Sequence, residues 1–107
     1  MPFAKVYPLY LTKVERKGRD RAELDTVIRW LLQIDEASLA KHLDEQTTFE
    51  DLFDQVRLNP ASQQITGMIC GMRVEQIEDP LMQKIRYLDK VVDELAQGKT
   101  MEKILRA

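Results

Sequence analysis

The stretch Asp79–Lys99, DPLMQKIRYLDKVVDELAQGK, decides the fold because it reads as one long amphipathic helix with a start signal and a stop signal. Asp79 can cap the open amides of the first turn, and Pro80 then takes the first helical position, where its missing N–H costs nothing. Gly98 is suited to the left-handed end of the helix. Steps of four and three residues form one apolar stripe of Leu81, Ile85, Leu88, Val92 and Leu95. We therefore predict a central helix over about 80–97 that buries this stripe.

The opposite side of this helix is polar. Arg86, Lys90, Asp93, Glu94 and Gln97 fall on it, so we expect their side chains to face solvent. A coiled-coil or partner-binding helix is the alternative interpretation, but the stripe is too short for a sustained heptad array. We interpret the stretch as the core helix of a small domain.

Two further helices are predicted near the start of the chain. The first is expected to end at Gly18, and Pro8 lies in its first turn or interrupts it. Asp20, with Glu23 three residues later, forms a capping-box pattern that predicts the start of the second helix. The apolar face of the second helix is Leu24, Val27, Ile28, Leu31 and Leu32.

Shorter helices follow, each with its own cap. Asp35 precedes a third helix, Thr47 or Thr48 caps a fourth, and Thr100 caps a last turn or two. These patterns predict an all-α fold, in which residues 1–107 form a single compact domain of five or six short helices around the central helix of about 80–97.

The segment 60–71 admits two interpretations. Asn59–Pro60 repeats the cap-and-proline pattern of the central helix, which favours a helix over 60–71. Gly67 and Gly71 oppose it, because each is unfavourable by about 1 kcal/mol relative to alanine inside a helix. The alternative is a buried extended stretch, ITGMIC. No strand alternation or hairpin is convincing elsewhere, so we favour the helix.

Length and composition place the protein among ordinary globular proteins. The chain has 107 residues, of which 44% are apolar and 32% are charged, which is enough for one core and argues against disorder. No apolar run approaches the ~18 residues of a membrane span, and the start lacks the pattern of a signal peptide. A single cysteine, Cys70, cannot form an internal disulfide. We expect a cytoplasmic protein without a membrane partner.

Charge is unevenly distributed along the chain, and the basic run near its start is the best candidate binding segment. Residues 1–21 carry six Lys/Arg against two acids, whereas residues 22–58 carry three against nine. The candidate anion-binding residues are Lys13, Arg16, Lys17, Arg19 and Arg21. The competing interpretation is that these side chains are solvated helix ends, partly paired with nearby acids. A helix-turn-helix is rejected because the would-be recognition helix carries mostly acids, so nucleic-acid binding is disfavoured.

The sequence offers no recognisable catalytic, metal or cofactor motif. Cys70 and His42 are the one pair able to supply a thiol nucleophile and a base. We expect Cys70 to be buried among apolar neighbours and His42 to lie at the surface, which argues against catalysis by this pair. One Cys and one His cannot make a zinc site, and the acidic clusters lack the spacing of a calcium loop. We therefore expect no enzyme activity, no cofactor and no metal.

The chain resembles a known family nearly from end to end. The residues that carry the resemblance are Tyr7-Pro8-Leu9-Tyr10, Glu15-Arg16-Lys17-Gly18-Arg19, Ile28-Arg29-Trp30-Leu31, Leu58-Asn59-Pro60, Ile69-Cys70-Gly71, Arg73-Val74-Glu75 and much of Asp79–Leu105. They are similar to small bacterial proteins known as domain of unknown function 2200. Relatives tend to read Thr-Gly-Tyr where this chain has Leu32-Gln33-Ile34, which leaves the end of the second helix open. The resemblance implies a compact helical fold in a bacterial cytoplasm, and it supplies no activity.

Three functional hypotheses follow. The first is a non-enzymatic helical protein that works through protein–protein contact, including self-association. The second is a binder of an anionic partner, RNA or a phosphate-bearing ligand, through the segment 13–21. The third is an enzyme with a carboxylate site that the sequence does not reveal.

Overall fold

The structure is a computed structural model that describes residues 2–106. Its α-helices are α1 (Phe3–Glu15), α2 (Arg21–Leu32), α3 (Glu36–Asp44), α4 (Phe49–Gln55), α5 (Pro80–Ala96) and α6 (Met101–Ile104). Between α4 and α5 lie the 3₁₀ turns η1 (Pro60–Gln64) and η2 (Val74–Gln76) and the two-residue strands β1 (Met68–Ile69) and β2 (Met72–Arg73). The predicted all-α class is confirmed, with one small hairpin added.

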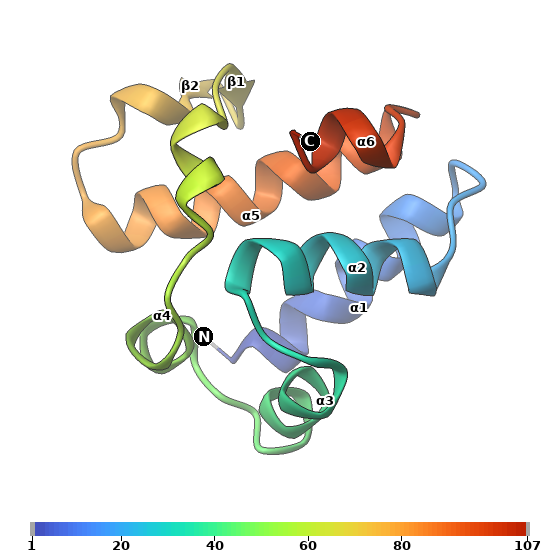
Figure 1. The fold of residues 1–107 in the computed structure, drawn as a ribbon, viewed down its shortest axis with the longest axis vertical. Coiled ribbons are helices and arrows are strands. Elements are labelled where there is room, and N and C mark those ends of the chain that lie inside the picture. The colour runs from blue at the N-terminus through green and yellow to red at the C-terminus, as the bar shows by residue number, and fades with distance from the viewer. Residues whose placement is uncertain (1, 107) are drawn as a thin grey trace.

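Helix α5 is the centre of the fold, as its sequence predicts. Asp79 caps it, because its Oδ1 accepts hydrogen bonds from the amide nitrogens of Leu81 and Met82 at 3.0 and 3.2 Å. Leu88, Val91, Val92 and Leu95 are fully buried. α1, α2, α4 and α6 all pack against α5, which runs through the middle of the molecule (Figure 1).

The caps of the first helices follow the sequence closely. Asp20 and Glu23 form the predicted capping box at the start of α2. Gln33 ends α2 in the left-handed conformation, with φ of 53°, at the position where relatives tend to carry glycine. Pro8 lies inside α1, because that helix already begins at Phe3. Its side chain is exposed, so the carbonyl deprived of its N–H partner can be hydrated.

The predicted helix over 60–71 is wrong beyond its first turn. Asn59 caps the turn that begins at Pro60, because its side-chain oxygen accepts from the amide N–H of Ala61 at 2.9 Å, but this turn is a short 3₁₀ helix that ends at Gln64. The chain then becomes extended and forms the β1–β2 hairpin, which the sequence did not reveal. The physical reason lies in the glycines: Gly67 and Gly71 adopt φ of 108° and 78°, which no α-helix contains.

The predicted solvent-facing side of α5 is wrong at Glu94. This carboxylate is buried, because α6 folds back over α5 and its end places Arg106 against it. Two guanidinium nitrogens of Arg106 each donate to a Glu94 oxygen at 3.0 Å. Within residues 2–106, no helix is long and apolar enough to cross a membrane.

Candidate contact surface

The segment between η1 and α5 forms an open groove on one end of the molecule. The hairpin turn consists of Cys70 and Gly71, both with positive φ (50° and 78°), as a two-residue type I′ turn requires. The hairpin and the segment that follows it border an open space with a volume of about 580 Å³. We call this the methionine groove; it is lined by Met68, Gly71, Met72, Arg73, Gln76, Ile77 and Glu78.

Three polar side chains of α5 hold this segment in place. Gln83, Arg86 and Lys90, spaced by three and four residues, lie on one face of the helix. Gln83 Nε2 donates to the carbonyl of Val74 at 3.2 Å, and Lys90 Nζ donates to the carbonyl of Met68 at 3.1 Å. Arg86 Nη1 donates to Cys70 Sγ at 3.3 Å. The central helix therefore holds the hairpin at its first strand and at its turn, and holds the η2 turn that follows its second strand.

Gly67 begins the hairpin in a backbone conformation, with φ of 108°, that disfavours other residues. The backbone N–H of Glu75 itself and the amide N–H of Gly67, which donates to Glu75 Oε2 at 3.1 Å, lower the pKa of the Glu75 carboxyl. The entry to the hairpin is thus fixed by both backbone and side-chain contacts.

The groove presents apolar side chains between two opposite charges. The side chains of Met68 and Met72 are exposed to 51% and 39%, and Ile77 is half-buried beside them. Arg73 and Glu78 line the same groove and bring a guanidinium and a carboxylate to it. Thioether side chains are flexible and polarisable, so they fit irregular apolar partners.

A polar cluster lies beside the turn of the hairpin, between α1 and α5. Tyr10 donates its hydroxyl to Asp89 at 2.5 Å, and Arg86 pairs with the same carboxylate at 2.8 Å. Burial and the negative charge of Asp89 raise the pKa of Tyr10. Tyr10 therefore stays protonated and acts as a hydrogen-bond donor that joins two helices.

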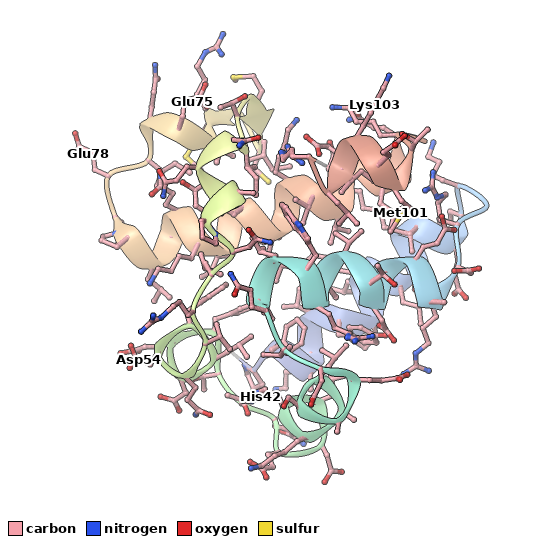
Figure 2. The ribbon with its side chains drawn as sticks, viewed as in Figure 1. His42, Asp54, Glu75, Glu78, Met101 and Lys103 are labelled. Atoms are coloured by element: carbon pink, nitrogen blue, oxygen red, sulfur yellow. The ribbon has the colours of Figure 1, made fainter. Side chains whose placement is uncertain are left out.

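The expectations for Cys70 and His42 are both wrong. Cys70 is exposed, because its place in a left-handed turn directs the chain away from the core. His42 is buried on α3, where its Nδ1 lies 3.0 Å from the hydroxyl oxygen of Thr47. The hairpin and α3 lie at opposite ends of the molecule (Figures 1 and 2), so the thiol and the imidazole are not brought together.

Lys13 and Arg19 of the predicted basic segment contact other parts of the protein. Lys13 Nζ lies 3.1 Å from Asp93 Oδ1 on α5. Arg19 pairs with Glu23 at 2.8 Å and donates to the carbonyl of Lys99 at 3.0 Å. The Lys13 contact joins α1 to α5, and the Arg19 contacts join the turn between α1 and α2 to α2 and to the turn that follows α5.

Arg21 lies apart from the others, at the start of α2. Its guanidinium donates to the hydroxyl of Tyr7 at 3.1 Å and stands 5.6 Å from the centre of that ring. Tyr7 donates in turn to Asp25, and burial together with this bond raises the pKa of Tyr7 to about 12. Arg16 and Lys17 are exposed, and neither forms an ion pair among residues 2–106. Anion binding by the segment stays a prediction.

The rest of the described surface offers one smaller depression and no cluster of metal ligands. A smaller depression of about 350 Å³ lies between α2 and α3 and is lined by Arg21, Ala22, Asp25, Glu36, Leu39, Ala40 and Leu43. Across the described residues 2–106, no three side chains of His, Cys, Asp or Glu gather in a way that could hold a metal ion.

The sequence did not reveal the methionine groove, because the segment 60–71 was interpreted as a helix. The signal that could have found it is the Cys70–Gly71 dipeptide with Gly67 shortly before it. Glycine at the second central position of a tight turn is typical of a type I′ hairpin. The ladder pairs Met68 with Arg73 and Ile69 with Met72, and of these four residues only Ile69 is buried, so both methionines of this short hairpin stay exposed.

Comparisons with known proteins agree with the fold. The model of a family described as uncharacterized protein conserved in bacteria (DUF2200) matches residues 1–106. A crystal structure of the uncharacterized protein SP1917 is similar over 99% of this chain and 88% of that chain, with 45% sequence identity and a TM-score of 0.91. No curated protein gives a match. The resemblance seen in the sequence is confirmed, and the chain belongs to the DUF2200 family of bacterial proteins.

Proposed function

We propose that this protein works through protein–protein contact rather than catalysis, and that the methionine groove is its contact surface. The observation that carries the proposal is the exposure of Met68 and Met72 on a hairpin that α5 holds rigidly. Exposed apolar surface rimmed by polar residues is typical of interaction sites. A preformed surface also binds with a smaller entropic cost than a flexible one. We propose that this contact takes place in the cytoplasm, because a protein whose single cysteine cannot form an internal disulfide is typical of that reducing compartment.

Site-specific photo-crosslinking tests the proposal. A photoreactive amino acid replaces Met72, and a matched protein carries it at Ala37, an exposed position on α3 at the opposite end of the molecule (Figure 1). Both proteins are irradiated in living bacteria, and the products are separated by mass and identified. We expect discrete crosslinked protein from position 72 and none from position 37. Equal yields at the two positions, or no product at either, would refute the groove as a contact surface.

Anion binding is the second candidate, and one contact favours it. The bond from Arg19 to the carbonyl of Lys99 brings the α1–α2 turn beside the α5–α6 turn, residues that are 80 apart in sequence. Exposed Arg16 and Lys17 on the first turn and Lys99 on the second therefore share one end of the molecule. Convergent cations of this kind attract phosphate groups through charge.

A titration with labelled single-stranded RNA tests this second candidate. Arg16→Ala with Lys17→Ala is the informative variant, because Arg19 holds the two turns together and its loss would disturb the fold. Lys41→Ala with Arg57→Ala removes the same charge from exposed positions elsewhere. We expect binding no tighter than about 10⁻⁶ M at physiological salt, weaker in the first variant and unchanged in the second. Absence of binding at low salt would dismiss the anion hypothesis.

A further inference from the structure

The two charged residues of the methionine groove make its surface complementary to itself. Arg73 and Glu78 have opposite charges, and the exposed Met68 and Met72 line the same groove. Glu78 projects outward from the segment that leads into α5 (Figure 2), and it forms no ion pair among residues 2–106. Arg73 has one partner, Glu75, at 3.6 Å, and its side chain is largely exposed.

Resting on the proposed function, we propose that the occupant of the methionine groove is a second copy of this chain, bound about a two-fold axis. In such a dimer the same patch is used twice, so each residue meets its complement on the other subunit. Arg73 would face the partner's Glu78, and Glu78 would face the partner's Arg73. The exposed methionines line the same groove and supply apolar contact. Because the groove carries one charge of each sign, two copies can meet with opposite charges facing, and this charge complementarity favours a second copy as the occupant.

The size of the groove sets the strength of this dimer. A groove lined by seven residues on each copy is small beside the ~20–30 residues a side of a stable interface. We therefore expect a weak dimer that forms and dissociates with protein concentration. The anchored backbone of the hairpin still favours association, because an already ordered segment loses little conformational entropy on contact.

Sedimentation velocity of the full chain over a range of concentrations tests the proposal. A reducing agent is present so that exposed Cys70 cannot link two copies. The variants are Arg73→Glu and Glu78→Arg, and Arg57→Glu, an exposed arginine outside the groove, is the matched charge reversal. Circular dichroism confirms that each variant is folded.

The mixture of the two groove variants is the decisive sample. Arg73→Glu alone and Glu78→Arg alone each place like charges in both contacts, so each should weaken the dimer at least about tenfold. Mixed in equal amounts, they pair opposite charges in both contacts and should dimerise again. Arg57→Glu should dimerise like the unmodified chain. Recovery in the mixture also shows that misfolding did not cause the loss.

The opposite results are equally clear. An unmodified chain that stays monomeric at every concentration, single variants that still dimerise, or a mixture that stays monomeric would each overturn the second-copy inference. If a crosslinker at Met72 then captures a different protein, protein contact through the groove still stands and only the identity of the partner is refuted. If that crosslinker captures nothing, the proposed function fails as well.

Discussion

Two neighbouring acids on α5 allow the effect of burial on an ion pair to be measured directly. Asp93 pairs with Lys13 at 3.1 Å, and Glu94 pairs with Arg106 at 3.0 Å. The exposed fractions of the side chains are 20% and 46% in the first pair, and 3% and 14% in the second. The two acids are neighbours on one helix and the ion-pair distances are nearly equal, whereas the second pair is more buried and bidentate.

We expect Arg106→Met to destabilise the protein far more than Lys13→Met. Methionine keeps most of the aliphatic stem, so the comparison isolates the charge. Removing one partner of a buried pair costs about 3–5 kcal/mol, because the remaining charge is stranded away from water. Lys99 Nζ remains 3.5 Å from Glu94, which places Arg106→Met near the lower end of that range. Loss of an exposed pair costs about 1 kcal/mol or less.

Urea unfolding followed by circular dichroism and by the fluorescence of Trp30 measures both effects. A loss of about 3 kcal/mol lowers the urea midpoint by about 1–3 M, whereas the exposed pair should move it by less than about 1 M. Glu94→Gln added to Arg106→Met should recover part of the loss, because it removes the stranded carboxylate. Equal midpoint shifts for Lys13→Met and Arg106→Met would refute the reasoning that burial decides.

Three further predictions test other parts of the structure. Burial raises the pKa of all three tyrosines, Tyr7 to about 12, so an absorbance titration of the folded protein should show no tyrosinate step near pH 10. In the unfolded chain the tyrosines ionise near pH 10. The stabilisation of the folded state by its protonated tyrosines is therefore complete below pH 10 and is lost as the pH rises towards 12 and beyond. Gln33→Gly should stabilise the protein by up to about 1 kcal/mol, because Gln33 is left-handed, whereas Gln97→Gly at a right-handed cap should give no gain in thermal unfolding. Cys70 should react with a thiol reagent as fast in the native protein as in denaturant, and slow native labelling would contradict its exposure.

The sequence by itself determined most of the α-helices and the caps at which they begin. Caps are local: the carboxylate of Asp20 or Asp79 reaches an amide only two or three residues away, so the chemistry is complete within one turn. The apolar stripe of α5 is equally local, because its spacing alone places Leu88 and Leu95 on one side. Family membership was also readable from the residues, and the family model confirms it.

The tertiary structure decided which surfaces stay exposed. Glu94 lies on the polar side of α5 by sequence, and it became buried only because α6 returned over that side with Arg106. His42 looked solvent-facing and became buried when the segment at Thr47 folded against it.

The methionine groove depends on both levels. Glycine geometry at Gly67 and Gly71 ends the helix locally, but the contacts that hold this segment come from Gln83, Arg86 and Lys90, nine to twenty-two residues away from their partners. Periodicity reports the environment of a residue only along its own element, whereas exposure depends on every element that packs against it. For this reason the helical fold could be predicted from the sequence. The exposure of Met68, Met72, Arg73 and Glu78 could not, because it depends on how segments far apart in the sequence pack together.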